Sequence, residues 1–193
     1  MRKKVFLLLL LLLSAYYYAA GQKVAFKTNL IYDATATVNV GAEIGLDSKW
    51  TLDVSGNLNS WSKDSYTKWK HLIVQPEARY WFCDRFSRHF IGFHLHGGIF
   101  NVGGINTVIP ILKQPIHDLS ENRYQGYLCG AGAAYGFAFI LSRNFNIEFE
   151  AGFGYAYLDY EKYTCIGCGR KVGEGTAHYF DPTKAALNIV YLF

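Results

Sequence analysis

Apolar and polar residues alternate one by one along much of the chain, most clearly from Asn144 to Leu158. The odd-numbered positions of this stretch, beginning with Phe145 and Ile147, are mostly aromatic or aliphatic, whereas the even-numbered ones up to Ala156 are Asn, Glu, Gly or Ala. Successive side chains of a β-strand point to opposite faces, so the pattern predicts a strand with one apolar and one polar face. Acids beside glycines on the polar face are typical of a transmembrane β-barrel with a polar lumen.

The same alternation recurs along the chain and predicts an all-β fold, an eight-stranded antiparallel up-and-down transmembrane barrel. The predicted strands are 24–33, 38–46, 50–59, 71–82, 90–100, 124–141, 144–158 and 183–193. Pro76 cannot donate to a ladder, so we expect a bulge or a gap in pairing there. A soluble β-sandwich is the alternative, because alternation alone does not distinguish a lipid-facing wall from a protein core.

Connections between the predicted strands alternate between short and long. Outer-membrane barrels have short periplasmic turns and longer outer loops, so we expect both termini in the periplasm. Aromatic residues near the strand ends predict two interfacial girdles. The expected periplasmic girdle is Trp50, Trp81, Tyr191 and Phe193, and the outer girdle is Tyr32, Trp61, Trp69, Tyr124 and Tyr157.

The first 21 residues combine a basic start, a short leucine-rich run and small residues up to Gly21. These features predict a secretory signal peptide, residues 1–21, followed by one barrel domain, residues 22–193. The apolar run is short for a spanning helix, which makes a retained anchor the less favoured reading. Cleavage removes three of the 19 basic residues and none of the 15 acidic ones, leaving a nearly neutral chain. Such a chain does not indicate a nucleic-acid partner.

Charged residues fall on the predicted lumen face of several strands. An eight-stranded barrel is only wide enough for side chains to fill, so we expect opposite charges to pair and plug it. A conducting pore, or an acid/base role for Glu148 and Glu150, is the alternative. The expected polar network is Lys27, Glu43, Asp53, Glu77, Arg79, Glu148 and Glu150.

Glycines are concentrated on the inward face of the strands from residue 90 to 158, whereas larger polar residues come from the earlier strands. Dense packing predicts that large side chains of one wall lie against the glycines of the other. The alternative is a small ligand cavity below the predicted loops 101–123 and 159–182. Its expected lining is His94, His96, Gly130, Gly132, Gly152 and Gly154.

The four cysteines do not predict a metal site. Cys83 falls in a periplasmic turn and Cys129 on the lipid face, while Cys165 and Cys168 could form a disulfide in the last outer loop. A zinc site would need a second ligand pair.

No catalytic, cofactor or metal site is predicted. A lipid-modifying enzyme remains an alternative, because several polar residues fall near the outer rim, yet no spacing joins a nucleophile to a base. These residues are His71, His117, His178 and Ser120.

The blocks KTNLIYDATATVNVGAEIG, WTLDVSGNLNSW, KWKHLIVQPEARYWFCDRF and HFIGFHLHGG, within Lys27 to Gly104, resemble a family of small outer-membrane β-barrel proteins of unknown function from Gram-negative anaerobes. The resemblance implies an outer-membrane location and brings no activity or catalytic residue. It also hints at a structural or surface-interaction role linked to surface appendages. The expected partners are outer-membrane lipid, the barrel-assembly machinery, and a surface protein bound through loops 101–123 and 159–182.

Overall fold

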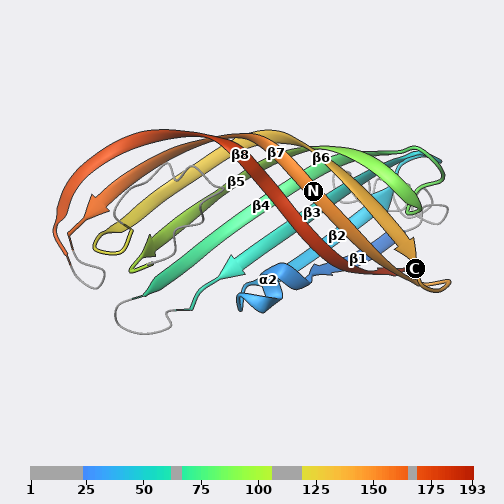
Figure 1. Ribbon diagram of the computed structural model, residues 1–193, viewed down its shortest axis with the longest axis horizontal. Helices are drawn as coiled ribbons and strands as arrows, with labels where there is room; N and C mark the ends of the chain where they lie inside the picture. Colours follow the sequence, from blue (N-terminus) through green and yellow to red (C-terminus); the bar gives the residue numbers. More distant parts are fainter. Residues whose placement is uncertain (1–23, 62–66, 106–118, 165–168) are drawn as a thin grey trace, which may run out of the picture.

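Eight antiparallel strands form a closed barrel in the computed structural model, which describes residues 24–61, 67–105, 119–164 and 169–193 (Figure 1). Each strand pairs with its neighbours in sequence, and β1 closes the barrel against β8. The predicted all-β, eight-stranded, up-and-down arrangement is confirmed. The strands are β1 Val24–Asn29, β2 Val38–Gly45, β3 Trp50–Asn59, β4 Lys68–Trp81, β5 Arg88–Gly103, β6 Arg123–Ile140, β7 Phe145–Tyr163 and β8 Lys171–Leu192.

The two ends of the barrel differ. At the end that holds Val24 and Phe193, the turns 46–49, 82–87 and 141–144 are short, and we call it the short-turn end. At the other end β5 to β8 extend well beyond β1 to β3, and we call it the long-hairpin end (Figure 1). The hydrogen-bonded register requires this stagger. Followed from strand to strand around the barrel, the register leads from Asn29 on β1 to Ala177 on β8, whereas Asn29 itself pairs with Asn188. Such a register offset tilts the strands of a barrel.

The first strand is shorter than predicted. Residues expected to continue it to Asp33 form a short helix, α2 Leu30–Ala34, because the Asn29 side chain caps the helix by accepting from the Ile31 amide at 3.0 Å. Asparagine is among the preferred N-cap residues, and this local bond outweighs the apolar alternation. Within the part of the chain that the structure describes, no helix combines the length and apolarity needed to cross a bilayer.

The last hairpin is longer than predicted, and the expected loop 159–182 is wrong. β7 continues to Tyr163 and β8 begins at Lys171, so most of this segment is paired strand. Glycines and charges occupy both faces here, as at Gly173 and Glu174, and alternation therefore gives no signal.

Pro76 lies at a gap in pairing, as predicted. β4 and β5 pair at Val74 with Gly97 and again at Glu77 with His94, in unchanged register but with no pair between them. The β3 side of Pro76 stays in register with Val54. The missing proline N–H is therefore accommodated without a bulge.

The wall of the barrel is apolar outside and polar inside. Phe93, Leu95 and Phe153 are 60%, 61% and 62% exposed, whereas the inward Glu43 and Arg79 are 0% exposed. The girdle prediction is wrong for three residues. Trp81 and Tyr124 are buried inside the barrel, and Tyr32 lines an interior cavity. Trp50, Tyr191 and Phe193 do lie exposed at the short-turn end.

The Asn29 side chain also extends the β1–β8 junction beyond the last backbone pair. Its amide nitrogen donates to the Ala185 carbonyl at 3.1 Å, and its oxygen accepts from the Leu187 amide at 3.2 Å. We predict that Asn29→Ala lowers the free energy of unfolding by about 1–2 kcal/mol, since the cap and these bonds are lost. Asn29→Asp keeps an acceptor and should cost less. Urea unfolding followed by circular dichroism measures both, and an alanine variant as stable as the parent would contradict this role.

Candidate functional site

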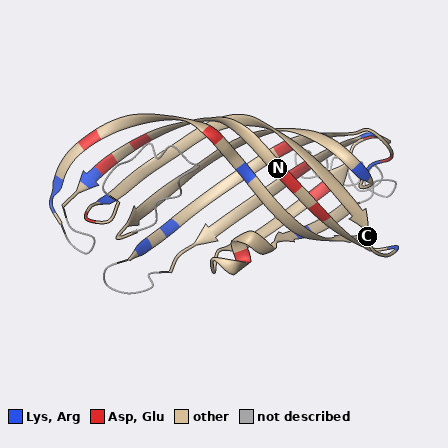
Figure 2. Ribbon diagram, in the orientation of Figure 1, with Lys and Arg blue, Asp and Glu red and all other residues tan. Residues whose placement is uncertain are grey.

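The Arg79 guanidinium lies at the centre of the barrel, on the inward face of β4. Its Nε is 2.6 Å from Glu77 Oε1 on the same strand, and its Nη1 is 2.8 Å from Glu43 on β2 and 3.1 Å from Glu148 on β7. Its Nη2 is 2.7 Å from Glu150 and 3.3 Å from Asp53 on β3. Figure 2 shows acidic positions of several strands gathered around this part of the barrel. One cation thus joins carboxylates from four strands.

Two lysines complete the network. Lys27 of β1 contacts Glu43 and lies 3.3 Å from Asp53 and 3.4 Å from Glu148. Lys184 of β8 lies 2.6 Å from Glu77 and 3.0 Å from Glu150. The structure therefore brings together all seven residues expected in the lumen and adds Lys184. The signal for Lys184 was its even-numbered place before Ala186 and Asn188 on the inward face of β8.

This network, which we call the lumen network, fills the barrel with side chains. Its carboxylates and basic groups are at most 8% exposed. Charges so far from water require partners, and here each acid lies within ion-pair distance of a basic group. The arrangement suits a structural plug, because an eight-stranded barrel is only wide enough for side chains to fill and these side chains are buried in it.

An aromatic cluster closes the short-turn end below the network. Trp81, Phe86 and Phe90 are at most 3% exposed, and the Trp81 and Phe90 ring centroids are 4.6 Å apart. The Arg79 guanidinium carbon lies 4.6 Å from the centroid of the Phe90 ring, a cation–π contact. Trp81 Nε1 donates to Thr51 Oγ1 at 2.9 Å. Trp81 shares the odd-numbered, inward positions of β4 with Glu77 and Arg79, so the alternation itself contradicts a place in the girdle.

The inward glycines face histidine side chains. A Cβ on Gly132 would lie 2.6 Å from His94 Nε2, one on Gly130 would overlap the His96 ring, and one on Gly152 would lie 3.1 Å from His94 Cε1. A Cβ on Gly154 would lie 2.9 Å from Thr183 Oγ1. The four glycines expected around a cavity thus make room for side chains of nearby strands, β5 and β8, and not for side chains of the opposite wall. His96 does line a cavity of about 300 Å³, which lies nearer the long-hairpin end.

A hydroxyl, a histidine and a carboxylate stand in a row beside this cavity. Thr183 Oγ1 lies 2.9 Å from His94 Nε2, and His94 Nδ1 lies 3.6 Å from Glu77 Oε2. The second distance exceeds a hydrogen bond, and Glu77 already accepts from Arg79 and Lys184. A base oriented by its carboxylate needs that second bond. Thr183 and Glu77 therefore pack as polar neighbours on either side of the His94 ring.

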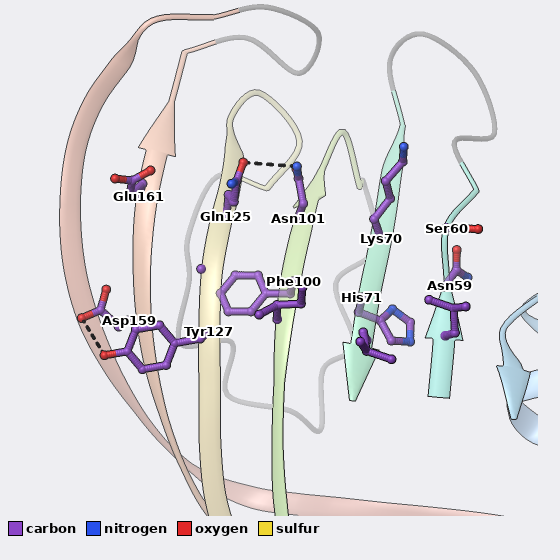
Figure 3. A pocket seen from close by; sticks show the side chains of 14 residues that line it. Asn59, Ser60, Lys70, His71, Phe100, Asn101, Gln125, Tyr127, Asp159 and Glu161 are labelled. Atoms are coloured by element: carbon purple, nitrogen blue, oxygen red, sulfur yellow. Dashed lines mark hydrogen bonds between the residues drawn. The ribbon is translucent and has the colours of Figure 1, made fainter. Parts of the chain in front are cut away.

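A larger cavity, of about 730 Å³, lies toward the long-hairpin end of β3 to β7 (Figure 3). It follows the line where outward apolar side chains give way to polar ones. Tyr127 donates to Asp159 Oδ2 at 3.4 Å, and Asn101 donates to Gln125 Oε1 at 3.3 Å along its rim. The outward residues of its lining are Leu58, Leu72, Ile99 and Tyr127 on the apolar side, and Ser60, Lys70, Asn101, Gln125, Asp159 and Glu161 on the polar side.

The remaining candidate residues lie apart from one another. Cys83 and Cys129 are exposed free thiols, and Cys165, Cys168 and His117 fall outside the described residues. His178 contacts the outward Tyr155 at 2.6 Å, and His71 packs against Trp69. No group of three or more metal-ligating side chains occurs in the described part of the chain.

One family model matches residues 5–193, and its description is protein of unknown function (DUF3575). No curated protein matches the chain.

Removing the central cation should leave several buried carboxylates without their main partner. We predict that Arg79→Met lowers the free energy of unfolding by about 3–5 kcal/mol, or prevents folding. Arg143→Met, in the exposed 141–144 turn, should change it by less than about 0.5 kcal/mol. Denaturant unfolding in detergent micelles compares the two variants. Equal stabilities would show that the lumen network does not depend on Arg79.

Close packing of glycine against Phe90 gives a second test. A Cβ on Gly136 would overlap the Phe90 ring, whereas one on the outward Gly56 would meet only a carbonyl oxygen 4.0 Å away. We predict that Gly136→Ala costs about 1–3 kcal/mol of unfolding free energy and that Gly56→Ala costs none. The same unfolding experiment checks both, and a harmless Gly136→Ala would contradict the packing account.

Proposed function

We propose that this chain, which belongs to the DUF3575 family of proteins of unknown function, spans the outer membrane of a Gram-negative cell as a plugged, non-catalytic barrel that presents its long hairpins to a surface partner. The observation that carries the proposal is the inverted wall, with aromatic and aliphatic side chains outside and charges inside. A protein dissolved in water rarely exposes a continuous apolar surface of this size. A barrel in lipid requires one.

The height of the apolar wall fits a bilayer. Outward apolar residues run from Ile91 to Ile99 on β5 and from Phe145 to Tyr157 on β7. At the rise and tilt of barrel strands these runs span roughly 20–30 Å, close to the apolar band of outer-membrane barrels. Polar residues follow at Asn101 and Asp159. The 730 Å³ cavity straddles this boundary, where lipid headgroups would begin.

The orientation follows from the two unlike ends. Short turns and both ends of the barrel domain would face the periplasm, and the hairpins would face outward. The predicted signal peptide, residues 1–21, lies outside the described residues and supports export. Phe193 is 67% exposed and packs edge-on against Tyr191 at the short-turn end.

A plugged lumen leaves the hairpins as the functional surface. β7 and β8 extend past the apolar wall as a polar ribbon, in which Lys171 bonds Glu161 at 2.6 Å and Glu174 at 2.8 Å. A stable barrel below holds this ribbon at a fixed place above the membrane. Display of a recognition surface is the role that this division favours.

Membrane insertion can be tested by introducing an arginine either within the apolar wall or beyond it. We predict that Leu95→Arg, in the middle of the apolar run of β5, costs about 2–4 kcal/mol of unfolding free energy in phospholipid vesicles. Val172→Arg, exposed on β8 beyond the wall, should cost less than about 0.5 kcal/mol. Unfolding in urea with the protein in vesicles gives both values. A Leu95→Arg protein as stable as the Val172→Arg protein would contradict a lipid-facing wall.

Planar bilayers test the plug. Because the lumen network fills the barrel, the purified protein should insert without stable single-channel steps. Heat-modifiable migration on gels should accompany insertion and report the folded barrel. Reproducible steps of constant size from the folded form would replace the plugged scaffold with a pore.

A further inference from the structure

Among the described residues, one edge of β8 has no neighbouring strand at the long-hairpin end. β1 pairs with β8 only from Asn188 to Leu192, and the Asn29 side chain extends the junction to Ala185. From Lys171 to Phe180, β8 pairs with β7, and no strand among the described residues pairs with its other edge. Figure 1 shows β8 arching away from α2 over this stretch. We call Lys171–Phe180 the open edge.

Pro182 blocks strand pairing just below the open edge, whereas the edge itself has the regular backbone of a strand. Pro182 has no N–H to leave unpaired, and its carbonyl accepts from the Tyr179 hydroxyl at 3.2 Å. Above it, the register with β7 runs without a shift from Pro182 to Gly173. An edge of regular backbone N–H and C=O groups is a template for one more strand.

A cavity lies directly behind this edge. The 300 Å³ cavity is lined by inward residues of β4 to β8 and by Tyr32 of α2, and no described residue of β1, β2 or β3 contributes to it. The missing side is the one that a continued β1 would have covered. Most of the lining is apolar, as at Ile73, Leu128 and Leu158. Alternate side chains of a strand added here would therefore point into an apolar pocket.

We propose that the open edge binds an extended segment of another protein by strand addition, with apolar side chains at alternate positions of that segment entering the 300 Å³ cavity. Backbone hydrogen bonds to the edge would give affinity, and the cavity would select the side chains. This proposal rests on the proposed function, because it names the kind of partner that the displayed hairpin takes.

A separate segment fits this edge better than a second copy of the chain does. A β8 edge paired with another β8 would offer its own inward positions, which are Gly173, Gly175, Ala177 and Tyr179. The first three have little or no side chain with which to fill the cavity, and Tyr179 already lines the cavity of its own chain. A partner strand with branched aliphatic residues at alternate positions fills the space, and such residues also favour strands.

The test uses a defined peptide and the full mature chain folded in detergent. The probe is a labelled peptide of alternating valine and threonine flanked by lysines, with alternate nitrogens methylated so that one edge is blocked and the other free. The control peptide has the same side chains and both edges blocked. Fluorescence anisotropy should show binding of the first peptide and at least about tenfold weaker binding of the second, since several hydrogen bonds are lost. Equal binding, or none, would overturn the proposal.

Two variants test the cavity separately from the edge. Ala156→Phe places a ring in the cavity and should weaken binding of the one-edge peptide at least about tenfold. Ala131→Phe adds the same ring to the exposed outer face of β6 and should leave binding unchanged. Heat-modifiable migration shows whether each variant is folded, and Ala156→Ile replaces Ala156→Phe if the larger ring prevents folding. Unchanged binding by the folded cavity variant would overturn the pocket.

Other outcomes are equally decisive. A Thr176→Cys protein that forms a disulfide-linked dimer, which the peptide does not prevent, would assign the edge to a second copy and overturn the proposal. A barrel that inserts into vesicles and binds no peptide would refute strand addition alone. A chain that does not insert would refute the proposed membrane function instead.

Discussion

The ion pairs of Arg79 are the interaction on which the barrel interior depends. One guanidinium contacts carboxylates from β2, β3, β4 and β7, so strands far apart in sequence meet at a single group. Arginine suits this place because its planar fork keeps its charge and offers several donors at fixed angles. Lys27 and Lys184 supply the remaining positive charge. With its buried charges paired inside, the barrel is free to present apolar side chains on its outer wall.

The two ends of the barrel are closed to different degrees. The short-turn end is sealed by Trp81, Phe86 and Phe90, and the lumen network fills the middle. Toward the long-hairpin end the packing changes, because β1 stops at Asn29 while β8 continues to Lys171. The closed lower barrel and the open edge of β8 therefore result from one property, the register offset of a tilted barrel. A scaffold that is closed below and open at one edge above is suited to holding a partner strand.

Much of this could be predicted from the sequence, and the limits have physical reasons. Alternation predicted the strands wherever one face is apolar and the other polar. It also placed Glu43, Arg79 and Glu148 on the inward face, where the structure shows them in contact. It failed where local bonding or mixed faces decide the backbone. Asn29 ends β1 by capping α2, and the upper β7–β8 hairpin has no apolar face to reveal it. The open edge and its cavity depend on register between distant strands, which single-strand patterns do not contain.

Spin labels on the outer wall test whether that wall faces lipid. With the native cysteines replaced by serine, labels are placed at Phe93, Leu95 and Ile99 of β5 and at Ser142 in a short turn, and the protein is folded into phospholipid vesicles. Oxygen collects in the hydrocarbon of a bilayer, whereas a nickel chelate stays in water. We expect oxygen to relax the three β5 labels and nickel not to reach them, whereas the Ser142 label should respond more to nickel than to oxygen. Nickel relaxation of the β5 labels as strong as that at Ser142 would contradict a barrel whose apolar wall faces lipid.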